Sequence, residues 1–265
     1  MKCSSTVHHN LYIPSFMKKN MNLTDIAEAR EFLRGFEKEM ANLYINGGIM
    51  GPSHFAIGNE EALVRIFRGL REGEYIPSSR TDLTQEGISA LQGRCQIEMH
   101  DSAKSDHPAF KGIKSSDWVF GSYRNHLHAL LHGVPREWLK QNIIEGKSME
   151  VVHPDYRIFT TGIVGGQLPI AVGYAFALKR KGSQNHVWAF CGDMAAETGI
   201  FEETSKYADN MRLPITFVIE HNGMSVDTPT AEVWGGISPL RRANTIRYFY
   251  KNQAPHQGVG KEVGF

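Results

Sequence analysis

Two short segments of this sequence carry side chains that could hold a metal ion against phosphate. Gly192-Asp193 follows the apolar stretch 186–191, and Asn222 follows the apolar stretch 215–219. Carboxylate and amide oxygens are ligands that a hard cation such as Mg²⁺ prefers. A helix that starts after Gly192-Asp193 would also turn its unbonded N–H groups toward phosphate oxygens. The two segments therefore predict a site for a cation that bridges phosphates.

This site requires both segments to lie at one edge of a parallel sheet. The sequence predicts a helix over residues 197–210, between the two strand-like stretches, and Pro214 ends it. A crossover of this length makes the two strands parallel, so their carboxyl ends meet at the same edge. Open α/β sheets bind their ligands at that edge.

The remaining sequence predicts one α/β domain with a helical N-terminal extension. Apolar residues recur at helical spacing over 22–45, and we expect residues 1–50 to pack on the core as the extension. Residues 51–265 then form a single α/β domain. Within it, residues 72–116 show little periodicity, which predicts a loop-rich insertion that is partly helical near 85–99.

Composition excludes several classes of function. The 265 residues include 29 basic and 28 acidic ones, and no basic run with interleaved aromatic residues occurs, so we expect no nucleic-acid partner. No stretch approaches the length of a membrane span, so we expect no membrane partner. The three cysteines are scattered and form no CxxC pair, which favours a reducing, cytoplasmic setting.

Several strings resemble the α subunits of thiamine-diphosphate-dependent 2-oxo-acid dehydrogenases, the decarboxylating first components. The matching strings are 43–49, His54 with 58–60, 117–126, 162–167, and Gly192-Asp193 with Asn222-Gly223. Each string alone is a weak signal, whereas their order and spacing together are specific. The resemblance implies the thiamine-diphosphate-binding fold, a mainly parallel sheet with helices on both faces. Residues 51–265 would be its diphosphate-binding domain.

The resemblance also implies site residues. Asp193, Asn222 and the backbone carbonyl of Met224 would bind Mg²⁺ against the cofactor diphosphate. His54 and His126 would be catalytic at the substrate end, where a proton is transferred or a carboxylate is bound. The full set of implied cofactor-binding residues is Tyr123, Arg124, Gly162, Val164, Gly192, Asp193, Met194, Ala195, Asn222 and Met224.

Two pairs in this set would have distinct tasks. Tyr123 and Arg124 would contact the diphosphate, because a planar guanidinium forks onto phosphate oxygens. Backbone groups of Gly162 and Val164 would hydrogen-bond the pyrimidine ring, and the Val164 side chain would support the bent form of the cofactor. The cofactor supplies the electron sink for decarboxylation of a 2-oxo acid.

In the family, the glutamate that activates the pyrimidine ring lies on a separate domain. A chain of 265 residues is too short to hold a second such domain. We therefore expect activity only with a β-type subunit that carries this domain and its glutamate, as an α₂β₂ assembly. A lipoyl acyltransferase is a further expected partner.

The sequence departs from the family pattern at several positions, and these departures keep two alternatives open. Met194 replaces a usual glycine, Glu197 replaces an amide or small polar residue, and the chain ends at residue 265, soon after Asn222. One alternative is a split carboligase or ketol transferase in small-molecule or sugar biosynthesis. The other is a non-catalytic paralogue subunit that keeps the fold.

Overall fold

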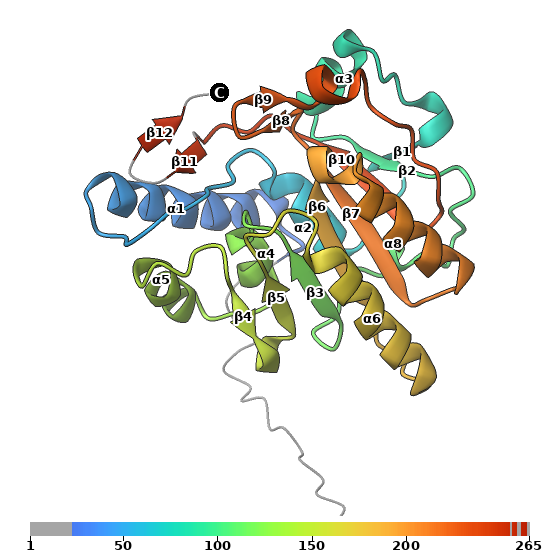
Figure 1. Cartoon of the computed structure of the whole chain (residues 1–265), viewed down its shortest axis with the longest axis horizontal. Coiled ribbons are helices and arrows are strands. Elements are labelled where there is room, and N and C mark those ends of the chain that lie inside the picture. Colours follow the sequence, from blue (N-terminus) through green and yellow to red (C-terminus); the bar gives the residue numbers. More distant parts are fainter. Residues whose placement is uncertain (1–22, 255, 259–260, 264–265) are drawn as a thin grey trace, which may run out of the picture.

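The structure, a computed structural model, describes residues 23–254, 256–258 and 261–263. Its centre is an eight-stranded sheet with the order β1-β2-β10-β7-β6-β3-β5-β4 (Figure 1). Neighbouring strands are parallel except for the pairs β10–β2 and β5–β4. The strands of this sheet are β1 (Tyr75–Pro77), β2 (Ile97–Met99), β3 (Trp118–Gly121), β4 (Val152–His153), β5 (Ile158–Thr160), β6 (Val187–Gly192), β7 (Ile215–His221) and β10 (Thr245–Phe249).

Helices pack on both faces of the sheet, as the sequence predicted. Two short hairpins, β8 (Met224–Ser225) with β9 (Thr228–Pro229) and β11 (His256–Gly258) with β12 (Lys261–Val263), lie outside the large sheet. The helices are α1 (Ile26–Ile45), α2 (Glu60–Arg68), α3 (Gln85–Gln92), α4 (His126–Leu131), α5 (Arg136–Ile144), α6 (Gln167–Arg180), α7 (Asp193–Ala196), α8 (Gly199–Asn210) and α9 (Thr230–Trp234). The α/β fold class is therefore confirmed.

Alternating side chains of the central strands build two separate hydrophobic cores. On β6, Ala189 and Cys191 belong to the core under α6 and α8, whereas Trp188 and Phe190 belong to the core under α1, α2, α4 and α5. A strand covered on both faces is apolar throughout, which is why β6 and β7 have continuous apolar sequences. Cys191 is fully buried, and burial raises the pKa of its thiol, so this cysteine is unreactive.

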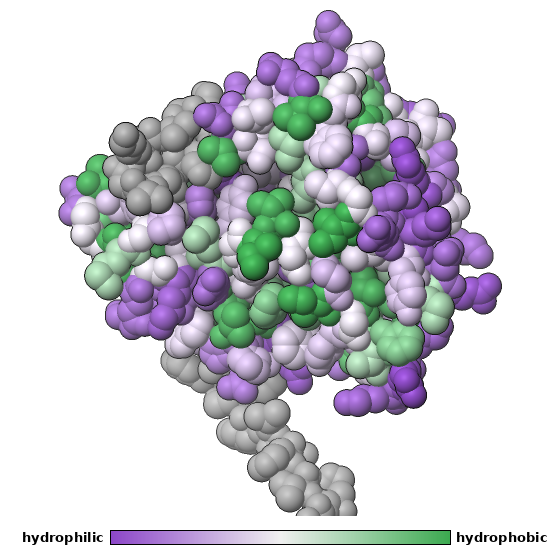
Figure 2. Space-filling view, in the orientation of Figure 1, coloured by the Kyte–Doolittle hydropathy of each residue, from purple (hydrophilic) through white to green (hydrophobic). Residues whose placement is uncertain are grey.

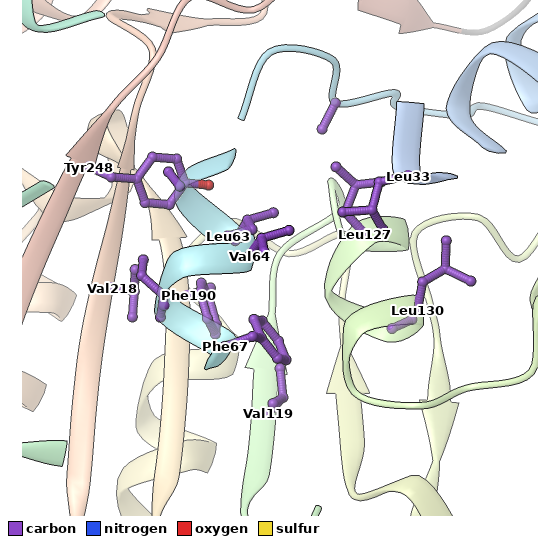
Figure 3. Packing of buried hydrophobic residues seen from close by; sticks show 14 of the residues in the cluster. Leu33, Leu63, Val64, Phe67, Val119, Leu127, Leu130, Phe190, Val218 and Tyr248 are labelled. Carbon is purple, nitrogen blue, oxygen red and sulfur yellow. The ribbon is translucent and has the colours of Figure 1, made fainter. Parts of the chain in front are cut away.

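Helix α2 is the centre of the larger core. Figure 3 shows its side chains between those of the sheet and those of α4. The ring of Phe67 on α2 stacks on that of Phe190 on β6, with centroids 6.2 Å apart. Leu63 and Val64 of the same helix are fully buried in this core. This packing fixes α4, which follows the loop that carries Tyr123 and Arg124.

The stretch 72–116 differs from the sequence prediction. It contributes β1 and β2 to the large sheet, and α3 ends at Gln92 instead of reaching residue 99. Both strands have only three residues, and β2 carries the fully buried Glu98, so neither has the alternation that identifies a strand from sequence.

The N-terminal helix is present, with a different start. α1 runs over Ile26–Ile45, and Asp25 caps it by accepting hydrogen bonds from the N–H groups of Ala27 and Glu28. Residues 1–22 of the predicted extension lie outside the described residues, and the boundary at residue 50 stays a prediction. No helix in the described part of the chain has the length and apolar character to cross a membrane.

Candidate functional site

The two predicted strand ends lie side by side at one edge of the sheet. β6 and β7 are parallel neighbours, and Gly192 at the end of β6 pairs with Glu220 near the end of β7. α7 begins with Asp193 directly after β6, and Asn222 directly follows β7. The predicted strand–helix–strand unit is therefore confirmed, and it brings the Asp193 carboxylate to the Asn222 backbone.

The carboxylate of Asp193 is buried and incompletely hydrogen-bonded. Asp193 is only 3% exposed, and its Oδ1 accepts a hydrogen bond from the backbone N–H of Asn222 at 3.4 Å. Within the described residues Oδ2 accepts no well-formed hydrogen bond: the buried Thr230 hydroxyl is near enough to lower the pKa of Asp193 but is not aligned for a hydrogen bond, and Nδ1 of His221 lies 4.0 Å from Oδ2. Burial raises the pKa of Asp193 to about 6 and lowers that of His221 to about 3, so His221 is neutral. A cation at Oδ2 would supply the missing partner.

The loop after β7, residues 222–224, lies next to Asp193. The side-chain Oδ1 of Asn222 accepts a hydrogen bond from the N–H of Met224 at 3.0 Å, and Gly223 between them has a φ of 82°. That left-handed φ suits glycine, which lets the chain turn sharply here. Gln92 on α3 donates from Nε2 to the carbonyl of Asn222 at 2.9 Å. A helix that the sequence placed in a loop-rich insertion thus supports the predicted metal site.

Most of the predicted cofactor-binding residues line one pocket at this edge. Eight of the ten do so, together with six residues that were not predicted, whereas Asp193 and Gly162 are not among the lining residues. The predicted ones are Tyr123, Arg124, Val164, Gly192, Met194, Ala195, Asn222 and Met224, and the others are Ser122, Gly165, Gln167, Glu220, Ser225 and Tyr250. No atom lies within 4 Å of the place where a side chain on Gly192 would start, so the space beside that backbone is open.

Arg124 brings positive charge to the pocket. It follows β3 by three residues and is only 8% exposed. Its Nη1 donates to the carbonyl of Phe55 at 2.6 Å, and its guanidinium carbon lies 5.6 Å from the centre of the Tyr123 ring. The centre of the His54 ring lies 4.7 Å from the centre of the Tyr123 ring. Such a held guanidinium is suited to phosphate or carboxylate oxygens.

Gly162 and Val164 lie on the loop between β5 and α6, and only one of them reaches the pocket. Val164 lines the pocket and is 55% exposed. Gly162 is not among the lining residues, and a side chain there would start 3.5 Å from the sulfur of Met149. Its predicted role toward a pyrimidine ring stays a prediction.

The two predicted catalytic histidines lie behind the pocket wall. His54 is 8% exposed, and its ring packs on that of Tyr123, which lines the pocket. His126 is 1% exposed, with Nε2 2.9 Å from the hydroxyl of Ser148 and Nδ1 3.3 Å from the carboxylate of Glu37. Both ring nitrogens of His126 are therefore already engaged, and neither histidine is among the lining residues.

The two departures in α7 have different surroundings. Met194 lines the pocket, and its sulfur lies 3.1 Å from the indole nitrogen of Trp234 on α9. Glu197 does not line the pocket, because its Oε1 accepts a hydrogen bond from the N–H of Ser238 at 2.9 Å. The methionine thus narrows the pocket, whereas the glutamate turns its charge away from it.

Sequence reasoning missed Glu220, a buried acid in the pocket wall. The Tyr248 hydroxyl donates to Oε1 of Glu220, and Nε2 of His128 lies 3.0 Å from the same oxygen. Asn59 donates in turn to the Tyr248 hydroxyl at 3.1 Å. Burial of Tyr248, and after it the nearby Glu220 carboxylate, raises the pKa of Tyr248 well above its ordinary value. The only sequence signal was a charged residue within the apolar stretch of β7.

Asp193 contacts the backbone of Asn222, the Asn222 side chain contacts the backbone of Met224, and Arg124 lines the pocket at the same edge of the sheet. The described residues contain no group of three or more His, Cys, Asp and Glu side chains that could hold a metal. A metal here would therefore depend on amide and carbonyl oxygens as well as on Asp193, a donor set that suits Mg²⁺ bound together with phosphates.

Comparison with known proteins points to one family. A family profile described as "Dehydrogenase E1 component" matches residues 86–246. The pyruvate dehydrogenase E1 component subunit alpha of Rickettsia prowazekii is 33% identical over 155 residues, 55% of this chain and 47% of that protein. The mitochondrial counterpart from Dictyostelium discoideum is 24% identical over 234 residues, 82% of this chain and 59% of that protein. The chain thus spans about half the length of these relatives.

Among solved structures, one described as a "putative thiamin diphosphate-dependent enzyme isolated from Mycobacterium smegmatis" matches with 25% identity and a TM-score of 0.31. The match covers 43% of this chain and 19% of that one.

Proposed function

Because the chain belongs to the dehydrogenase E1 component family, we propose that it is an α-type subunit that binds thiamine diphosphate and Mg²⁺ and decarboxylates a 2-oxo acid. One observation carries the proposal: the buried Asp193 carboxylate leaves Oδ2 without a well-formed hydrogen bond in the described residues, and its chain neighbours Gly192 and Met194 line the pocket that holds Arg124. A buried acid without a partner is costly unless a ligand completes it.

Several polar groups in and beside the pocket have proposed tasks. Asp193, the Asn222 side chain and the Met224 carbonyl would hold Mg²⁺. Arg124, with Tyr123 against it, would hold the diphosphate oxygens, because its guanidinium is already fixed by the Phe55 carbonyl. Thiamine diphosphate, when bound, supplies the electron sink for decarboxylation.

We propose that His54 acts at the substrate end, since its ring packs on that of Tyr123 in the pocket wall. His126 would act as a positioning residue, because Glu37 and Ser148 engage its two ring nitrogens. The neutral His221 beside Asp193 would leave the carboxylate available to the metal, since an uncharged ring does not compete as an ion-pair partner.

The surroundings of the pocket support a partner that covers it. Ile163 and Val164 beside the pocket are 71% and 55% exposed, and Trp234, which contacts the pocket-lining Met194, is 47% exposed. Figure 2 shows hydrophobic residues gathered near the middle of this face of the molecule. Apolar surface of this kind usually marks a protein interface. We propose that a β-type subunit covers it in an α₂β₂ assembly and supplies the activating glutamate.

Calorimetry on the chain assembled with its β-type subunit tests the cofactor site. We expect thiamine diphosphate to bind only with Mg²⁺, and Asp193→Ala to abolish that binding while leaving the fold intact. Asp209→Ala, a change of the same kind at an exposed position of α8, is the matched control. Unchanged affinity of the Asp193 variant would refute the metal assignment.

Turnover assays with two acceptors identify the reaction. A lipoyl domain accepts the acyl group if the assembly is a dehydrogenase that works with a lipoyl acyltransferase. An aldehyde acceptor reports the carboligase or ketol-transferase alternative. Absence of magnesium-dependent binding of thiamine diphosphate to the assembled pair would instead indicate the non-catalytic paralogue, which keeps the fold and binds the cofactor poorly.

A further inference from the structure

A second cavity, of about 170 Å³, lies between the start of α8 and strand β10. It shares no lining residue with the candidate cofactor pocket. Its wall includes Gly199 and Glu202 of α8, Ser238 and Arg242 of the loop before β10, and Arg247 of β10. Its volume is that of several water molecules, which is enough for a small ion with polar oxygens.

Arg247 is a buried cation in this wall whose hydrogen-bonding capacity is largely unused. It is 2% exposed, and its Nη2 donates to the carbonyl of Ser238 at 2.6 Å. Its Nη1 lies 3.6 Å from Oε2 of Glu98, and in the described part of the chain neither Nη1 nor Nε has a hydrogen-bond partner. A guanidinium has five N–H donors, so most of them would be satisfied only by a further acceptor.

The start of α8 contributes a second, independent feature to the same cavity. The hydroxyl of its N-cap residue, Thr198, donates to the carbonyl of Ala195 at 2.6 Å and does not cap the helix. The first N–H groups of this 12-residue helix therefore lack a side-chain cap from Thr198 and carry the positive end of the helix dipole. At Gly199 a side chain would meet no atom within 4 Å, so the space there is open.

The two acids of the wall are already engaged. Arg242 donates through Nη1 to Oε2 of Glu202 at 3.0 Å, and Oε1 of Glu197 accepts from the N–H of Ser238. Arg241 also lines the cavity. The two acids of the wall therefore leave the open donors of Arg247 unsatisfied, and Glu98, which lies outside the wall, is an ion-pair partner of Nη1 at 3.6 Å without a hydrogen bond to it.

We propose that this cavity binds a small oxyanion, a phosphate or carboxylate group, between Arg247 and the first turn of α8. The planar guanidinium would fork onto two oxygens, and the N–H groups of the helix would take the others. The proposal depends on these groups alone and holds whether or not the cofactor pocket binds thiamine diphosphate.

Titration calorimetry on the full chain at constant ionic strength tests the proposal, with inorganic phosphate and malonate as probes. We expect saturable binding of at least one probe, and the tighter one shows whether phosphate or carboxylate is preferred. Phosphate also suits the pocket at Arg124, so each titration is repeated with Arg124→Met, in which binding at the cavity is expected to persist.

Two variants locate the site. Arg247→Met removes the cation and should weaken binding about tenfold or more, the usual effect of losing a charge-assisted hydrogen bond. Gly199→Glu puts a carboxylate at the cavity, which repels the anion and competes with it for Arg247, and should weaken binding by about as much. Gly199→Ala and the distant Arg180→Met should bind like the unchanged chain. Gly199→Glu should fold well, because an acid in the first helical turn is favourable, so it decides the test even if Arg247→Met does not fold.

The proposal is overturned if neither probe binds saturably. It is also overturned if Gly199→Glu binds as tightly as Gly199→Ala.

Discussion

Replacing Asp193 by asparagine should stabilise the ligand-free chain while removing its metal site. Burial raises the pKa of Asp193 from its ordinary value of 3.8 to about 6. The folded state therefore holds the proton more tightly than the unfolded state does. The stabilisation by the protonated acid is complete below pH 3.8 and is lost as the pH rises through about 6.

The size of the effect follows from that difference. A shift of about 2 pKa units corresponds to roughly 3 kcal/mol at pH 7.5, where the carboxylate is charged in both states, and to about half of that at pH 5. Asparagine carries no charge and keeps an oxygen for the N–H of Asn222. We therefore expect Asp193→Asn to raise the free energy of unfolding by up to this amount, more at pH 7.5 than at pH 5.

Urea unfolding of the ligand-free chain at the two pH values measures the difference, with Asp209→Asn at the surface as the control. The same variant should gain no stability from Mg²⁺ with thiamine diphosphate, whereas the unchanged chain should. A variant that is less stable than the unchanged chain at pH 7.5, or equally affected at both pH values, would show that burial of this carboxylate is not costly.

Three further predictions concern the pocket and the core. Arg124→Lys should weaken thiamine diphosphate binding about tenfold in calorimetry, because an ammonium cannot fork onto two oxygens. The indole of Trp234 contacts the pocket-lining Met194, so cofactor binding should change the tryptophan fluorescence, and Trp234→Phe should remove that change without preventing binding. Phe190→Ala should lower the free energy of unfolding by about 3–5 kcal/mol in urea, because Phe190 is fully buried and stacked on Phe67.

The sequence predicted the features of this fold that depend on local patterns. An apolar stretch followed by Gly192-Asp193, a helix of suitable length, and a second apolar stretch before Asn222 can form only a few arrangements, and the right-handed parallel unit is the common one. Both strands and the helix between them lie within two residues of the predicted bounds.

Features that depend on distant partners were not predictable in the same way. Glu98 makes β2 look unlike a buried strand, because its partner Arg247 is contributed by β10, far along the chain. Glu220 likewise has its contacts with Tyr248 of β10 and His128 of α4, which lie far from it in the sequence. A buried charge in a single sequence gives no indication of the group that stabilises it.

The short helix α7 explains how changes outside the cofactor pocket can affect it. Asp193 and Met194 begin this helix on the side of the pocket, and Glu197, directly after it, is tied to Ser238 beside the second cavity. The backbone of this four-residue helix is continuous, so a hydrogen bond that holds Glu197 also restrains the end of the helix that carries Asp193. The loop before β10 therefore contributes to the position of the Asp193 carboxylate without touching the pocket. Ser238→Pro would remove the N–H that donates to Glu197, so calorimetry should show weaker magnesium-dependent binding of thiamine diphosphate than in the unchanged chain; unchanged affinity would show that this hydrogen bond does not position Asp193.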